Sequence, residues 1–339
     1  MSFLRRIKRR TEYVALSARM RLPGFVRKQL VQGNDVIVMY HGVDSCSNRT
    51  YNFRHISKDT FEAHLQFFSQ FFRVTPLSEM FHPGQVEERP RLAITFDDGY
   101  RNNFDNAVPL LEAHRLPATI FVTAIRALNW DILWPDFWDL FASLSEVRRL
   151  ELQDQVFVKN SERKYDPFIS SSGTTLQSHM KDLTFPQKER WLKHALELEP
   201  EFRDKLAKYR EYWELIDTES LQSFHSPYVQ IGCHGLSHDN LGRLSRADRE
   251  RELRESKAWL EKRLGNEIAS LAYPDGCYNS ELIDFAESLG FREQLAVSYK
   301  SQEDTADRRI LNRVGVYAYQ KPVEQLWEIV KVSGGNSKS

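Results

Sequence analysis

Short apolar runs alternate along the chain with segments whose apolar residues recur at helical spacing. Seven runs have strand length, at residues 35–40, 91–96, 118–123, 229–234, 269–274, 294–299 and 313–319. Most are apolar throughout rather than alternating with polar residues, which indicates strands buried on both faces, as in parallel sheets. Because helical segments separate the runs, the pattern predicts an α/β fold whose sheet is either open or closed into a barrel.

Polar residues mark where three helices begin. Ser57 precedes one helix, Asn279 precedes another, and Ser245 with Asp248 resembles a capping box before a helix that Gly265 ends. Between residues 125 and 228 the alternation stops, because that stretch has no clear apolar strand run. We interpret residues 125–228 as a mainly helical insertion within one domain that covers residues 31–335. A separate second domain is the alternative.

Composition narrows the class of protein. Lysine plus arginine total 47, as do aspartate plus glutamate, so the net charge is zero and a nucleic-acid partner is not expected. The apolar runs are too short to span a membrane. Three scattered cysteines are too few for a disulfide framework, and the first residues do not form a secretory signal. We therefore expect a cytoplasmic protein, and the sequence indicates no protein partner.

The first 30 residues are locally basic, with nine lysines and arginines against the single acid Glu12. Apolar residues are interleaved with these charges. Residues 1–30 are therefore predicted to form an amphipathic helical segment that binds peripherally to the anionic inner face of a membrane. A solvated N-terminal helix is the alternative interpretation.

Three of the predicted strands end in residues that can carry chemistry. The run TFDDGY places Asp97 and Asp98 before a glycine turn, and HGLSH places His234 and His238 four residues apart. The third, AYPDG, is a rigid turn at residues 272–276. The carboxyl ends of parallel strands are where α/β folds place their sites. Each motif also has a structural interpretation, since Asp-Asp-Gly is common in turns and histidines are common in cores.

Together, one carboxylate and two imidazoles make a three-ligand metal site with open coordination positions. That pattern is typical of catalytic sites, because structural zinc sites are closed by four ligands. The second carboxylate is then available as a general base for a metal-bound water.

In kind, order and placement, the three motifs resemble the first three motifs of the polysaccharide deacetylase superfamily, carbohydrate esterase family 4. The resemblance covers residues 35–123 and 229–319. It implies a distorted parallel (β/α) barrel of about seven strands and one divalent metal ion, commonly Zn²⁺, with Co²⁺, Ni²⁺ or Fe²⁺ as alternatives. It also implies hydrolysis of the acetyl group of an N-acetylated sugar.

The resemblance assigns a role to each matching residue. Asp97 matches the catalytic base, and the metal ligands are Asp98, His234 and His238. The backbone N–H of Tyr100 matches the donor that holds the acetyl oxygen. Among the residues expected to contact the substrate are three from the third motif and one tryptophan of the insertion: Tyr273, Pro274, Asp275 and Trp138. Tryptophans at the spacing of Trp138 also suit a core.

The chain departs from the family pattern at two places. The arginine that braces the catalytic base is replaced by Ala272, and Arg313 or Arg101 is the candidate substitute. The late histidine that serves as general acid is missing, because no histidine follows Asp275. Some members look circularly permuted, and the segment Met39-Tyr40-His41 resembles that arrangement. Since the first and last strands of a closed barrel are neighbours, His41 is predicted to be the general acid; a structural histidine is the alternative.

These observations predict a metal-dependent N-deacetylase that acts on a saccharide or glycan precursor, with cell-surface glycan biosynthesis as a hypothesis. Two alternatives stay open. One is a sugar-binding barrel that has lost turnover, which the missing motif arginine suggests. The other is a metal hydrolase that cleaves a different amide or an ester, including an O-acetyl group.

Overall fold

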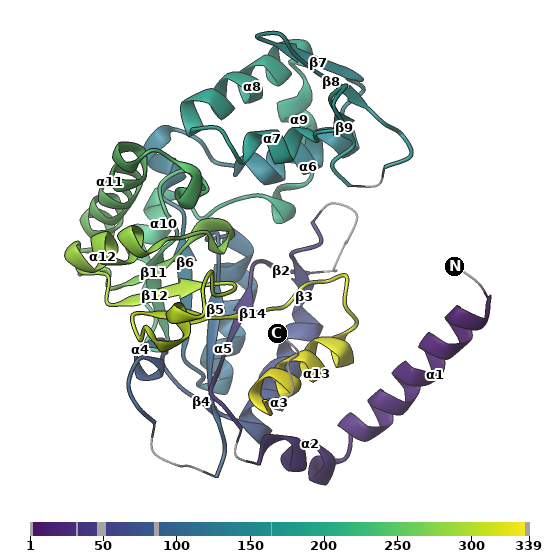
Figure 1. The fold of residues 1–339 in the computed structure, drawn as a ribbon, viewed down its shortest axis with the longest axis vertical. Coiled ribbons are helices and arrows are strands. Elements are labelled where there is room, and N and C mark those ends of the chain that lie inside the picture. Colours follow the sequence, from purple (N-terminus) through teal and green to yellow (C-terminus); the bar gives the residue numbers. More distant parts are fainter. Residues whose placement is uncertain (1–2, 32, 46–51, 85–87, 164, 336–339) are drawn as a thin grey trace.

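The computed structural model describes residues 3–31, 33–45, 52–84, 88–163 and 165–335 (Figure 1). Nine strands of these residues form one parallel sheet. In spatial order they are β13 (Ile310–Asn312), β12 (Glu293–Ala296), β11 (Ser270–Ala272), β10 (Val229–Cys233), β6 (Ala118–Val122), β5 (Arg91–Phe96), β1 (Val36–Tyr40) and β14 (Val314–Gly315), with β4 (Arg73–Val74) beside β5.

One short segment of chain joins the two ends of this sheet. β13 pairs with β12, and after the single residue Arg313 the chain pairs through β14 with β1. The sheet is therefore a nearly closed barrel, which confirms the predicted fold class. Three predicted strands are shorter than expected. Residues 269–274 form only β11 (Ser270–Ala272), residues 294–299 pair only as far as Ala296, and residues 313–319 pair only as far as Gly315.

The central strands β1, β5 and β6 are buried on both faces, and most of their residues are apolar. On β1, Val36, Val38 and Tyr40 belong to the large core outside the barrel, whereas Ile37 lies in a small cluster inside it. That inner cluster also contains the side chains of four other strands and of α4 (Leu77–Met80): Ala93, Phe121, Ala272, Leu295, Leu77 and Met80. The inward-facing position is thus every second residue of a strand.

Helices pack on the outer face of the barrel through the large core. They are α3 (Lys58–Phe71), α5 (Val108–His114), α10 (Thr218–Ser223), α11 (Arg246–Leu264), α12 (Ser280–Ser288) and α13 (Pro322–Ser333). The predicted caps are present, because the side chains of Ser57, Ser245 and Asn279 each accept a backbone N–H of the first helical turn. Gly265 ends α11 with a positive φ of 71°.

Most of the segment predicted as an insertion lies above one end of the barrel in Figure 1. The end of the predicted segment differs, because Ile216, just before α10, and Leu221, within α10, pack in the core of the barrel. The part above the barrel contains α6 (Trp134–Leu144), α7 (Leu176–Met180), α8 (Phe185–Leu198) and α9 (Phe202–Ala207). It also contains an antiparallel sheet that the sequence pattern did not indicate, made of β7 (Arg149–Leu152), β8 (Gln155–Lys159) and β9 (Phe168–Ile169). Its apolar side chains form a core of their own, separate from the core of the barrel.

Two helices form the N-terminal segment, α1 (Phe3–Met20) and α2 (Pro23–Leu30), and α1 extends away from the barrel (Figure 1). α2 is attached to the barrel by α13, where the rings of Phe25 and Trp327 stack with their centroids 5.8 Å apart. Among the described residues, no helix combines the length and the apolar character that crossing a bilayer requires.

Candidate active site

Two of the predicted catalytic side chains lie at inward-facing positions just beyond the ends of their strands. Asp97 follows β5 two residues after Thr95, and His41 follows β1 two residues after Met39. Met39, His41 and Asp97 all line a cavity of about 430 Å³ at this end of the barrel. Within the barrel, the inward-facing positions of these strands hold mostly apolar residues. Just beyond the strand ends, the same alternation places His41 and Asp97 in the cavity.

The next residue, Asp98, enters the same cavity because the backbone turns sharply. Asp98 has a φ of 76° and Gly99 a φ of 82°, both in the left-handed region. A side chain at Gly99 would also come within 3.1 Å of Val122, so glycine is needed there for space as well as for its backbone. A left-handed aspartate is strained, and such strain is typical of functional sites.

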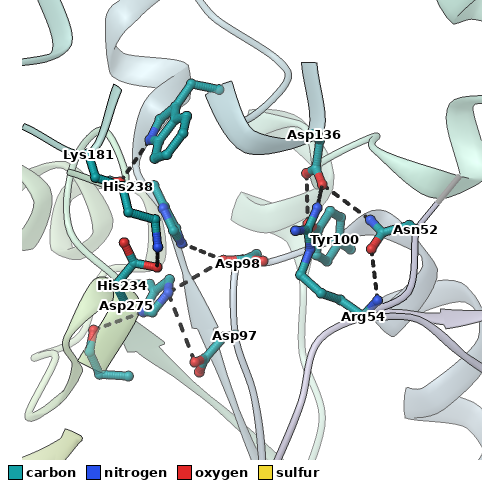
Figure 2. A network of polar contacts seen from close by, with 12 residues as sticks. Asn52, Arg54, Asp97, Asp98, Tyr100, Asp136, Lys181, His234, His238 and Asp275 are labelled. Carbon is teal, nitrogen blue, oxygen red and sulfur yellow. Dashed lines mark hydrogen bonds and ion pairs between the residues drawn. The ribbon is translucent and has the colours of Figure 1, made fainter. Parts of the chain in front are cut away.

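His234 and His238 converge on Asp98 from the loop after β10 (Figure 2). The Asp98 Oδ1 atom lies 3.4 Å from His234 Nε2 and 3.2 Å from His238 Nε2. With bonds of about 2.0–2.1 Å, neighbouring ligand atoms of a tetrahedral zinc site lie about 3.3 Å apart. The three side chains therefore have the spacing that one bound cation requires, and their ligand atoms all lie within 4.8 Å of one another.

The chemistry of these donors also suits a cation. His234 Nδ1 lies 2.8 Å from the carbonyl oxygen of Ala272, which can only accept, so Nδ1 carries the proton and Nε2 presents a lone pair. Asp98 Oδ1 is buried and has no hydrogen-bond donor within the described residues.

The loop that carries the histidines is fixed from two sides. The carboxylate of Glu252, on α11, accepts the backbone N–H of Leu236 at 3.0 Å, and the N–H and hydroxyl of Ser237 at 3.0 and 2.7 Å. From the insertion, Trp134 Nε1 donates to the carbonyl of His238 at 3.0 Å. Such bonds behind the ligands hold the imidazoles in place.

Arg313 braces the predicted base. Its guanidinium donates to both oxygens of Asp97, at 2.6 and 2.7 Å, and neither side chain is more than 4% exposed. Burial by itself would raise the pKa of Asp97, but the charge of Arg313 outweighs it and leaves that pKa lowered. Of the two candidates for replacing the missing motif arginine, Arg313 is the one that contacts Asp97, whereas Arg101 pairs with Asp217 at 2.5 Å.

Arg313 comes from the residue that joins β13 to β14, two positions after the inward-packed Leu311. Ala272 lies in the apolar cluster inside the barrel. The brace is thus supplied by the strand that closes the barrel rather than by the third motif. Closure is what brings Arg313 and Asp97 together, since 215 residues separate them along the chain.

The two remaining catalytic candidates lie at the cavity as well. The two backbone bonds that flank Tyr100, Ile216 N–H to Gly99 and Arg101 N–H to Glu214, do not use the Tyr100 N–H. His41 is largely enclosed, and burial lowers its pKa to about 4 although the charges of Asp98 and Asp97 oppose the shift. Its imidazole is therefore neutral at pH 7 in the resting site, with Nδ1 buried and unpartnered within the described residues.

One wall of the cavity is a polar network that the motifs did not indicate (Figure 2). Asp136, at the start of α6, accepts the Tyr100 hydroxyl at 2.7 Å and the Asn52 amide at 3.2 Å, and it pairs with Arg54. Burial raises the pKa of Asp136 to about 6. Arg54 also reaches Asp139, at 3.1 Å. The insertion thus supplies part of the site, through Asp136 of α6 and Gln177 of α7, which both line the cavity.

Of the four residues predicted to contact the substrate, only Asp275 lines the cavity. Asp275 lines the cavity with a φ of 55° and pairs with Lys181 of the insertion at 3.1 Å. Tyr273 and Pro274 are buried and are not among the lining residues, and the Tyr273 hydroxyl donates to Gln294. Trp138 is 1% exposed and packs in the core of the insertion, so it does not reach the cavity.

The aromatic face of Trp138 packs against other side chains in the core of the insertion. Trp134, one helical turn earlier, lines the cavity instead. Sequence spacing alone could not separate the two, because both residues lie on the same face of the helix.

Comparisons with known proteins agree with this geometry. A family model described as polysaccharide deacetylase matches residues 84–156 and 176–294. The chain is 33% identical over 90 residues to YxkH of Bacillus subtilis (strain 168), a protein whose name describes a polysaccharide deacetylase. That match covers 25% of this chain and only 30% of the relative's length.

Two solved structures share the fold. One is BC0361, a polysaccharide deacetylase from Bacillus cereus, with a TM-score of 0.51 and 15% identity over 88% of this chain and 69% of that one. The other is a de-N-acetylase from Aggregatibacter actinomycetemcomitans, with a TM-score of 0.50 and 14% identity over 87% of this chain and 98% of that one. At this level of identity the likeness concerns the fold alone.

Proposed function

This chain belongs to the polysaccharide deacetylase family, and we propose that it is a metal-dependent hydrolase that removes the acetyl group from an N-acetylated sugar. The observation that carries the proposal is the convergence of Asp98, His234 and His238 beside the braced carboxylate of Asp97. Zn²⁺ is the proposed ion, because two imidazoles and one carboxylate at tetrahedral spacing suit it.

When bound, a divalent cation at these three side chains polarises a carbonyl oxygen and lowers the pKa of water. Asp97 takes the proton of the attacking water, because Arg313 keeps it ionised and fixes its orientation. The Tyr100 N–H donates to the oxygen that becomes negative as the carbonyl carbon turns tetrahedral. Losing one such donor typically costs about 3 kcal/mol of transition-state stabilisation.

Breaking the carbon–nitrogen bond requires a proton on the departing amine. The proton that Asp97 takes from water is the one that the amine needs, and we propose that His41 delivers it. A neutral imidazole in the same cavity can accept a proton and pass it on. An acetyl ester needs this help less, because an alcohol leaves more readily than an amine does.

The proposal is tested by acetate release from the zinc-loaded protein, with N-acetylated oligosaccharides and O-acetylated sugars as parallel substrates. We expect release from the N-acetylated set, and none from it after Asp97→Asn, with the metal retained. Bound metal without acetate release from any N-acetylated saccharide would contradict the proposal and favour a sugar-binding barrel. The sugar-binding alternative rests on the absence of the motif arginine. The contact between Arg313 and Asp97 argues against it, because Arg313 braces Asp97 in place of that arginine.

We also propose that residues 1–30 bring the enzyme to an anionic membrane surface, in line with a lipid-linked or membrane-proximal glycan as substrate. Lys8, Arg10 and Arg19 are exposed on α1, and Val14 is 60% exposed among them. Reversing the charges of Arg10 and Arg19 should weaken cosedimentation with phosphatidylglycerol vesicles about tenfold or more. Unchanged cosedimentation would refute membrane attachment through α1. The cytoplasmic compartment stays a prediction from the sequence.

A further inference from the structure

The second histidine of the candidate metal site, His238, is held less directly than the first. His234 Nδ1 lies 2.8 Å from the carbonyl oxygen of Ala272, which fixes that imidazole from behind. His238 Nδ1, in contrast, is buried and has no hydrogen-bond partner within the described residues. The backbone of His238 is also strained, since its φ of 60° lies in the left-handed region. Contacts to the backbone around His238 must therefore keep its imidazole directed at Asp98.

A buried lysine of the insertion holds the residue that follows His238. Lys188, on α8, pairs with Asp239, and neither side chain is more than 2% exposed. The other carboxylate oxygen of Asp239 accepts the backbone N–H of Phe185 at 2.8 Å, at the start of the same helix. Helix α8 thus binds both oxygens of Asp239. Since lysine is almost never fully buried unless it is paired, this ion pair is a specific contact between the insertion and the histidine loop.

Lys188 also packs against the second contact to this backbone. Its Nζ atom lies 4.8 Å from the centre of the Trp134 ring, at cation–π distance. Trp134 Nε1 in turn donates to the carbonyl oxygen of His238 at 3.0 Å. Helices α6 and α8 therefore hold the carbonyl of His238 and the side chain of the next residue together. A rotation of the His238 backbone out of its strained conformation would break at least one of these contacts.

We propose that Lys188 is a positioning residue for the metal site, through which the insertion sets the orientation of His238. The inference rests on the metal site of the proposed function and gives the insertion a role in it. Lys188 acts through Asp239 and Trp134. Residues that hold metal ligands in this indirect way typically contribute about 10- to 100-fold to metal affinity. The insertion is then part of the metal-binding machinery as well as a wall of the cavity.

The first test measures zinc affinity of the full chain by competition with a chelating dye. We expect Lys188→Met to weaken zinc binding about tenfold or more, because the side chain of Asp239 is no longer held. Lys193→Met is the control on the same helix, since Lys193 is 59% exposed and pairs with Glu189. Lys205→Met is the control for the stability of the insertion, because it removes the partner of the buried Glu199 without touching the histidine loop. Both controls should keep the zinc affinity of the wild type.

A double variant separates the positioning of His238 from the balance of buried charge. Lys188→Met leaves the buried charge of Asp239 unpaired, which by itself destabilises the fold. Combining it with Asp239→Asn removes both charges, so most of the lost stability should return in urea titrations. Zinc binding should nevertheless stay weak, because a methionine cannot donate to the side chain at position 239. The double variant also carries the test if Lys188→Met alone does not fold.

The visible spectrum of the cobalt-loaded protein reports the geometry of the site independently of its affinity. At saturating Co²⁺, the absorption bands of Lys188→Met should shift or lose intensity relative to the wild type, whereas those of Lys193→Met and Lys205→Met should not. An unchanged spectrum in Lys188→Met would contradict a role in orienting His238.

The inference is also overturned if folded Lys188→Met, or the double variant, binds zinc as tightly as the wild type. It is equally overturned if Lys205→Met weakens zinc binding as much as Lys188→Met does, because the effect would then reflect the stability of the insertion. Acetate release plays no part in these measurements. A wild type that binds zinc without turnover therefore contradicts the deacetylase proposal alone, whereas a wild type that binds no zinc overturns both.

Discussion

Replacing Arg313 by methionine should disable Asp97 as a base while leaving the metal ligands intact. The pair is bidentate and buried, with Arg313 0% and Asp97 4% exposed. Removing one partner of such a pair leaves an uncompensated buried charge, which costs about 3–5 kcal/mol. Asp97 can avoid that cost by binding a proton, which removes the buried charge. The cost then appears as a higher pKa of Asp97, with each pKa unit worth about 1.4 kcal/mol.

The sign of the pH effect follows from this. In the wild type the pKa of Asp97 is lowered, so its ionisation stabilises the fold above the unfolded pKa, and this contribution is lost as the pH falls through the folded pKa. In Arg313→Met, burial is no longer opposed and the folded pKa rises. The variant should therefore lose stability relative to the wild type as the pH increases, and the acid limb of its kcat/KM profile should move to higher pH.

The assay is acetate release as a function of pH, together with metal content by mass spectrometry. Loss of a general base predicts a fall in kcat of about 100-fold or more at neutral pH, with partial recovery at higher pH. Arg313→Lys should be intermediate, since it keeps a charge but cannot donate to both oxygens at once. Arg101→Met is the control, because Arg101 is 36% exposed and pairs with Asp217. Wild-type kinetics in Arg313→Met, or loss of its metal, would refute the reasoning.

Three further outcomes follow. Asp98→Ala should lose bound zinc in elemental analysis, whereas Asp97→Asn should retain it without turnover; loss of zinc in both would mean that Asp97 is a ligand. Glu252→Gln should weaken zinc affinity about tenfold or more by releasing the loop at Ser237, measured by competition with a chelating dye, and unchanged affinity would contradict that role. Ser245→Ala should lower the free energy of unfolding by about 1 kcal/mol in urea titrations, without change in kcat.

Much of the barrel was predictable because its strands are buried on both faces. A strand buried on both faces is mostly apolar, so β1, β5 and β6 were visible as apolar runs of about the right length. β10 was visible too, although its Gln230 is exposed. The small sheet of the insertion was not predicted, because β7 and β8 are short and each has only one fully buried residue. The caps at Ser57, Ser245 and Asn279 were also predictable, because a cap is a local interaction between residues a few positions apart in the sequence.

The candidate site also contains residues that the sequence could predict and residues that it could not. The sequence predicted that Asp97, Asp98, His234 and His238 belong to one site, because the strand or turn that carries each of them sets its position. Substrate contacts depend on how separate parts of the chain meet. Trp134 and Trp138 have the same spacing and residue type, but only one faces the cavity.

The sequence by itself determined most of the central strands of the barrel, the strand ends that carry the predicted metal ligands, and the absence of the motif arginine. Only the tertiary structure decided what replaces that arginine. The choice between Arg313 and Arg101 depends on barrel closure. Closure brings the guanidinium of Arg313 into contact with Asp97, whereas Arg101 stays partly exposed and pairs with Asp217. Local sequence encodes the geometry of a strand or turn, whereas a contact across 215 residues exists only once the strands have closed into a barrel.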